Sequence, residues 1–107
     1  MSLHVTLLVT KPTAVYSDNI THNLAQMAVA SGIYMYLWRP DELGITEASE
    51  LIKPLREGLA KLKTYRTKFE KHNPENGWGD YNGLVKFVTN YLEACEAEPS
   101  AAVSVCR

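Results

Sequence analysis

The segment Leu3–Val9, LHVTLLV, decides the fold because its side chains alternate between two faces. One face carries Leu3, Val5, Leu7 and Val9, and the other carries His4, Thr6 and Leu8. A period of two that includes β-branched residues predicts a strand. The segment Ala101–Cys106 offers Val103 and Val105 in the same alternation, so the two terminal strands are predicted to pair as an antiparallel ribbon.

Two strands alone are marginally stable, so the ribbon must pack on helices. We therefore predict an α+β fold that is mostly helical, with three to four helices, in a single domain over residues 1–107. The open edges of such a ribbon are a place for a second subunit, so a homo-oligomer is also predicted.

Composition excludes several functional classes. The 107 residues contain 11 Lys+Arg and 12 Asp+Glu, a formal net charge of −1, and this balance argues against direct nucleic-acid binding. No apolar run approaches the ~20 residues of a membrane span. The opening Met1-Ser2-Leu3 lacks the features of a signal peptide, so we expect a cytoplasmic protein with two free thiols. Cys95 falls on the apolar stripe of a helix, whereas Cys106 is expected at the surface.

The first half of the helical region is predicted from spacing and breakers. A helix over Asp18–Ser31 is capped by Ser17 or Asp18 and stopped by Gly32. Ile33–Trp38 alternates like a strand but follows a helix directly, and we favour a short helix. Arg39-Pro40 ends it, because the residue before proline avoids the helical region.

The second half contains two longer helices. Thr46–Lys71 keeps a helical period, with Pro54 predicting a kink or a late start. Its last turns contain five cationic residues, namely Lys61, Lys63, Arg66, Lys68 and Lys71. They either form an anion-binding face or complement the negative end of the helix dipole. The segment His72–Asp80 is predicted as a loop, and Asp80 is predicted to cap a helix over Tyr81–Ala97.

An enzyme is not predicted. His4, His22 and His72 have no neighbour at metal-ligand spacing, and the sequence contains no HExxH, CxxC or GxxxxGK pattern. We expect no metal and no cofactor.

The remaining polar and aromatic residues are suited to recognition. Amides read the polar edges of a ligand, indole and phenol rings stack on planar rings, and arginine binds anions. The candidate ligand-binding residues are Asn19, His22, Asn23, Trp38, Arg39, Asn76, Trp78 and Tyr81. The alternatives are that the tryptophans pack in the core, that Asn76 serves only its turn, and that Arg39 only covers the Trp38 ring.

These residues fall in three blocks: the first block is Asn19–Leu24 (NITHNL), the second is Leu37–Pro40 (LWRP), and the third is Asn73–Gly79 (NPENGWG). Together they resemble a small family of phage- and prophage-encoded proteins, over about Val15 to Arg107. The resemblance implies a viral or prophage origin and a host cytoplasm, and it carries no catalytic mechanism. Small phage proteins of this kind often act on host pathways, including immunity.

Two hypotheses follow. The first is a non-enzymatic binding protein that sequesters a small anionic, nucleotide-like ligand as a counter-defence. The second is an inhibitor or adaptor that uses an aromatic patch around Trp38 and Trp78 to bind a host protein.

Overall fold

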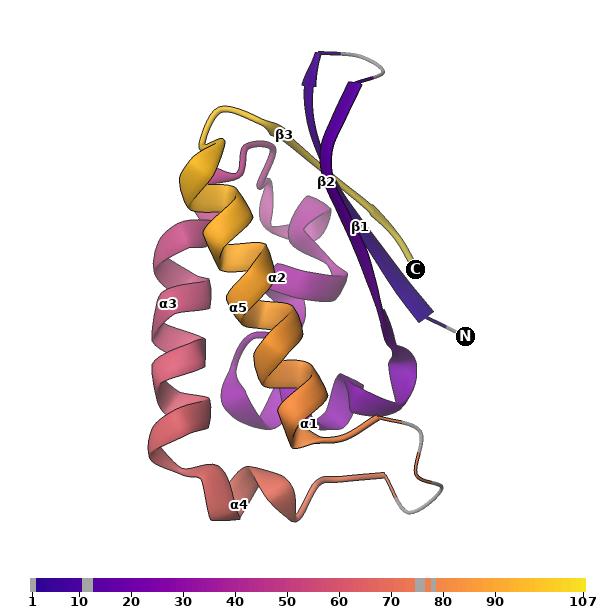
Figure 1. Cartoon of the computed structure of the whole chain (residues 1–107), viewed down its shortest axis with the longest axis vertical. Coiled ribbons are helices and arrows are strands. Elements are labelled where there is room, and N and C mark those ends of the chain that lie inside the picture. Colours follow the sequence, from indigo (N-terminus) through magenta and orange to yellow (C-terminus); the bar gives the residue numbers. More distant parts are fainter. Residues whose placement is uncertain (1, 11–12, 75–76, 78) are drawn as a thin grey trace.

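The computed structural model describes residues 2–10, 13–74, 77 and 79–107 of the chain (Figure 1). Helices pack on one face of a three-stranded antiparallel sheet, which confirms the α+β class. In chain order the elements are β1 (Ser2–Thr10), β2 (Thr13–Thr21), the 3₁₀ turn η1 (His22–Leu24), α1 (Ala25–Ser31), α2 (Tyr34–Trp38), the 3₁₀ turn η2 (Pro40–Leu43), α3 (Ser49–Thr64), α4 (Arg66–Glu70), α5 (Tyr81–Ala97) and β3 (Ala102–Cys106).

The sheet has the order β2-β1-β3, so the predicted pairing of the two terminal strands is confirmed. Val5 lies opposite Val105 and Leu7 opposite Val103, both on the face that meets the helices. Val9 departs from the predicted alternation and is 42% exposed. Val9 has no partner in β2, because it lies at the irregularity between Leu8 and Thr10, where the regular pairing of β1 with β2 breaks.

The predicted helix over Asp18–Ser31 is wrong at its start, because Asp18–Thr21 belong to β2. Ser17 and Asp18 are therefore strand residues and not the predicted helix cap. Ile20 lies opposite Leu3 in the sheet and is buried there. A strand residue in this position satisfies the same apolar spacing as the first turn of a helix, so the pattern did not separate the two. The helical part begins with η1 and α1, and α1 ends at Gly32 with φ +82°, as predicted.

The short helix predicted after Gly32 is confirmed as α2. The long helix predicted over Thr46–Lys71 is instead two helices, α3 and α4, separated at Tyr65 with φ −112° and ψ 42°. The predicted start at Thr46 is also wrong, because α3 begins at Ser49. The Glu50 carboxylate accepts the backbone amides of Thr46 and Glu47 ahead of the helix. Helix α3 begins before Pro54 and includes it.

Helix α5 has the predicted bounds and cap, since the Asp80 carboxylate accepts the Gly83 amide at 2.7 Å. Its buried stripe packs on α3 and includes Cys95, whose predicted burial is confirmed, as is the exposure of Cys106. Among the described residues, none of the helices combines the length and the apolar character needed to cross a bilayer.

The two edges of the sheet differ. The outer edge of β3 is partly covered, because the Val103 amide donates to the Thr46 carbonyl and Ala102 bridges to Glu47. The outer edge of β2 has no partner strand among the described residues. The predicted homo-oligomer stays a prediction, and β2 is the edge on which a second copy would extend the sheet.

Candidate functional site

The first and second sequence blocks meet at His22. The His22 ring lies 6.1 Å from the Trp38 ring, centroid to centroid, at an interplanar angle of 58°. Trp38 in turn stacks on Tyr34 at 5.3 Å and 10°. Helix α2 therefore supports the turn η1 from one side through a column of rings.

The third block meets the first at Gly79. Its φ is +95°, and a Cβ built there would lie 2.8 Å from Thr21 Cγ2 and 3.0 Å from Leu24 Cγ. Only glycine leaves room for this approach, since these distances are shorter than ordinary carbon contacts. Gly79, at the end of the segment between α4 and α5, therefore packs directly against η1 and the residue before it.

A cavity of about 630 Å³ lies between η1 and the segment that follows α4. We call it the His22 cavity. Its described lining is His22, Asn23, Gln26, Lys71, His72, Asn73 and Pro74. None of these residues is acidic, and Lys71 makes no ion pair with any described residue. The volume is in the ~300–1,000 Å³ range of ligand pockets.

His22 contributes a buried polar atom to this region. Its Nε2 has no hydrogen-bond partner among the described residues. A buried imidazole nitrogen without a partner is costly, and a ligand in the cavity reaches this atom only if the His22 side chain moves. Beside it, Thr21 Oγ1 accepts hydrogen bonds from the Asn23 amide at 3.3 Å and from Asn23 Nδ2 at 2.9 Å, which orients the Asn23 side chain.

The far wall of the cavity is tied to the core. Asn73 Oδ1 accepts the Tyr81 amide at 2.8 Å, which draws the two ends of the segment between α4 and α5 together. The Tyr81 hydroxyl donates to the Leu62 carbonyl at 2.9 Å and so anchors the start of α5 on α3.

A second cavity, of about 360 Å³, lies between β2, η1 and α5. We call it the Asn19 cavity. Buried Ile20, Leu24 and Phe87 form its apolar part. Its polar groups come from Asn19, Thr21, Lys86 and Asn90, and Gly79 also lines the cavity. Asn19 is therefore brought to this cavity, and His22 and Asn23 are brought to the neighbouring one.

Burial corrects two of the predicted ligand contacts, and the prediction for Arg39 is not supported by either cavity. Trp38 is 3% exposed and Tyr81 is 5% exposed, so both rings are part of the core and neither can stack on a ligand. Arg39 lines neither cavity: its Nη1 pairs with Glu42 at 2.6 Å and its Nε donates to Tyr34 at 3.3 Å. Both partners favour the charged guanidinium and raise the pKa of Arg39 further above its usual range. Asn76 and Trp78 lie outside the described residues.

Several lining residues were not singled out from the sequence. The sequence indicated Lys71 only as one of five cations at the end of a predicted helix. It indicated His72 and Asn73 only as the start of a loop. Gln26 falls on the polar side of α1, next to the buried Met27. Their common signal is that they follow α4 or η1 directly, which becomes informative only once those two elements are known to face one another.

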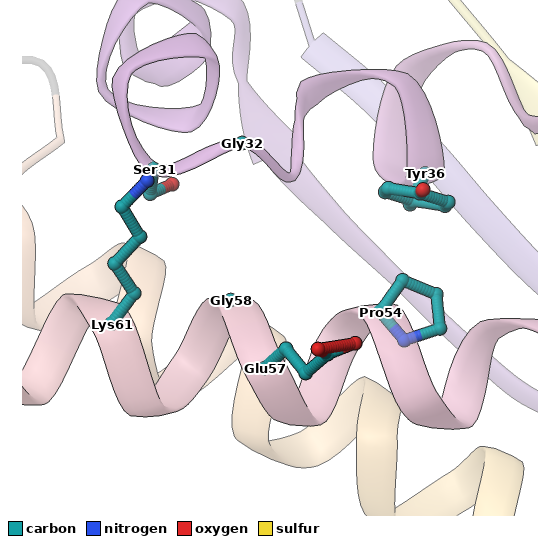
Figure 2. A pocket seen from close by; sticks show the side chains of 7 residues that line it. All are labelled: Ser31, Gly32, Tyr36, Pro54, Glu57, Gly58 and Lys61. Atoms are coloured by element: carbon teal, nitrogen blue, oxygen red, sulfur yellow. The ribbon is translucent and has the colours of Figure 1, made fainter.

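A third cavity, of about 210 Å³, lies between the link from α1 to α2 and helix α3. Figure 2 shows Lys61 reaching toward Ser31, with the Glu57 carboxylate and Tyr36 farther along the cavity. It is smaller than the usual ligand pocket, carries charges of both signs, and contains no residue of the three blocks. The candidate site is therefore the pair of cavities at η1.

The described residues contain no group of three or more His, Cys, Asp or Glu side chains placed to hold a metal ion. Comparisons of the chain with protein-family models, with curated proteins and with solved structures found no match.

Proposed function

We propose that this chain is a non-enzymatic binding protein for a small anionic ligand, held in the His22 cavity. The observation that carries the proposal is the composition of that cavity. Its described lining brings one lysine, two imidazoles and three side-chain amides together without a carboxylate. Such a set offers several donors to phosphate-type oxygens and no like charge to repel them.

The local geometry supports the same ligand class. His22 lines the cavity, and the neighbouring Trp38 ring limits the movement of its imidazole. Lys71 follows α4 and lines the cavity, and because it makes no ion pair with another described residue, its ammonium attracts anions.

The proposal is binding without turnover. Among the described residues that line the His22 cavity, none is a cysteine, serine or carboxylate that an imidazole would activate. This lining supports binding of the anion, and sequestration of a nucleotide-like signal in a host cytoplasm stays a prediction from the resemblance to phage and prophage proteins.

Calorimetric titration at low salt with inorganic pyrophosphate tests the proposal, with Lys71→Ala as the variant and Lys63→Ala as the matched control. Lys63 is exposed on α3 and lines neither cavity. We expect Lys71→Ala to weaken binding about tenfold, the effect of losing one charged hydrogen bond, and Lys63→Ala to leave it unchanged.

Two results would overturn the proposal: no measurable pyrophosphate binding by the wild-type chain, or equal affinities for both lysine variants. Mass spectrometry of the supernatant after denaturing the purified protein adds an unbiased search for a bound anion. Pyrophosphate that is cleaved during incubation would refute binding without turnover.

The second hypothesis, an inhibitor or adaptor for a host protein, required both Trp38 and Trp78 in a surface patch. Trp38 is buried and cannot form part of an aromatic surface patch, and Trp78 lies outside the described residues. That hypothesis stays a prediction, and a pull-down from host lysate tests it.

A further inference from the structure

The open face of the sheet places an imidazole and a thiol side by side. His4 on β1 lies opposite Cys106 on β3 in the antiparallel register. The next pair in the register, Val5 and Val105, packs on the core, so the alternation of each strand turns His4 and Cys106 to the other face. Both side chains are exposed there. Strand pairing therefore joins two residues from opposite ends of the sequence that have no partner at local spacing.

The spacing of this pair suits a single metal ion. Residues directly opposite one another in an antiparallel pair have Cβ atoms ~4.5–5.5 Å apart. A tetrahedral zinc ion, bound at ~2.3 Å to sulfur and ~2.0 Å to nitrogen, holds those two atoms about 3.5 Å apart. The Cys106 sulfur and a ring nitrogen of His4 can reach this separation by side-chain rotation, without movement of the backbone.

Neither side chain is engaged elsewhere in the described part of the chain. Cys106 is a free cysteine, and neither its thiol nor the His4 ring makes a hydrogen bond or an ion pair with a described residue. Arg107, the cation next to Cys106, donates to the Asp41 carboxylate at 2.9 Å and to the Trp38 carbonyl at 2.9 Å. A metal ion therefore displaces no contact of the pair, and the neighbouring positive charge is already paired.

The other residues of this face determine which ions fit. By the register and the alternation, the described side chains beside the pair are uncharged, namely Ser2, Thr6, Ser17, Asn19 and Ser104. Because none of them is a carboxylate, Mg²⁺ and Ca²⁺ find few of the oxygen ligands that they prefer. A thiolate with an imidazole favours zinc and related ions instead.

We propose that Cys106 and His4 bind a thiophilic divalent metal ion of the zinc class on the open face of the sheet. Water completes the coordination of the ion, as it does at open zinc sites. Binding converts the Cys106 thiol to a thiolate and releases its proton to the solvent. The site shares no residue with the lining of the His22 cavity, so it is independent of the proposed anion binding.

Calorimetric titration of the reduced protein with zinc chloride tests the proposal, and we expect one ion per chain. His4→Gln and Cys106→Ser should each weaken binding at least about tenfold, because loss of an outer-shell partner alone weakens metal sites by about 10–100-fold. The matched controls are His72→Gln, at an exposed histidine of the His22 cavity, and Ser104→Ala, at an exposed position of β3. Both controls should keep the wild-type affinity.

Two further measurements identify the ligands directly. Cobalt(II) in place of zinc should give a thiolate-to-metal absorption band that is absent in Cys106→Ser and weaker in His4→Gln. In the wild-type chain, zinc chloride should slow the reaction of Cys106 with a thiol reagent, and magnesium chloride should not. The second comparison uses no variant, so it does not depend on how well a variant folds.

Three results would overturn the proposal. The first is no zinc binding by the wild-type chain. The second is wild-type affinity in His4→Gln, which would mean that the thiol acts alone. The third is an equal loss of affinity in His72→Gln, which would place the ion in the His22 cavity.

Discussion

The substitution Gly79→Ala tests the contact that brings the third sequence block onto η1. Gly79 has φ +95°, and an added methyl would lie 2.8 Å from Thr21 Cγ2 and 3.0 Å from Leu24 Cγ. Gly77 is the matched control in the same segment: its φ is +75°, and nothing lies within 4 Å of a Cβ built on it. Both variants carry the backbone cost of a left-handed conformation, and only Gly79→Ala carries the clash.

The magnitudes follow from these two terms. A left-handed conformation costs a residue with a Cβ about 1–2 kcal/mol. Forcing a methyl into a closely packed place costs about 1–3 kcal/mol more. We therefore expect the free energy of unfolding to fall by about 1–2 kcal/mol in Gly77→Ala and by about 2–5 kcal/mol in Gly79→Ala.

Urea unfolding followed by circular dichroism gives both free energies from the transition midpoints and slopes. Pyrophosphate titration of the two variants adds a local readout, because a displaced segment after α4 would move Lys71 and weaken binding in Gly79→Ala alone. Equal destabilisation of the two variants, with equal affinities, would refute the packing of Gly79 against Thr21 and Leu24.

Four further predictions concern the core, the two thiols and the start of α5. Gly58→Ala should destabilise the protein although alanine normally favours a helix interior by ~1 kcal/mol, because the added methyl would overlap the Ile33 side chain; a higher melting temperature would contradict this. A thiol reagent at neutral pH should modify exposed Cys106 and spare Cys95, because burial raises the pKa of the Cys95 thiol to about 12. Mass spectrometry counts the modified thiols, and labelling of both cysteines in the folded chain would disprove this prediction. Because an unfolded thiol ionises near ~8.5, the free energy of unfolding should also decline as pH rises above about 9, and less steeply in Cys95→Ala. Asp80→Ala should cost about 1 kcal/mol by removing the cap of α5, with Asp80→Asn retaining most of the stability.

The parts of the fold that sequence predicts are those set by local pattern. The alternation of Leu3–Val9, the stop at Gly32 and the cap at Asp80 each have a local physical cause, and each is present in the structure. Strand β2 was missed because its buried residue Ile20 continues the apolar spacing of the following helix. Its pairing with β1, which makes it a strand, is a contact between distant residues.

The candidate site divides in the same way. The side-chain chemistry of His22 and Asn23 was readable from sequence, and the structure places both in one cavity. Whether Trp38 faces solvent or core was not readable, because the answer depends on Tyr34, which stacks on the Trp38 ring, and on His22, whose ring is tilted beside it. Lys71 was one cation among several until α4 was placed opposite η1.

The convergence of the sequence blocks on one ligand site is tested most directly by a ¹⁵N-resolved NMR titration with adenosine 5′-monophosphate. The amides of His22–Gln26 and Lys71–Asn73 should shift together with one binding constant, and the Trp38 indole should follow them through the His22 ring. Shifts confined to the cavity between α2 and α3, or different binding constants for the two segments, would contradict a shared site at η1.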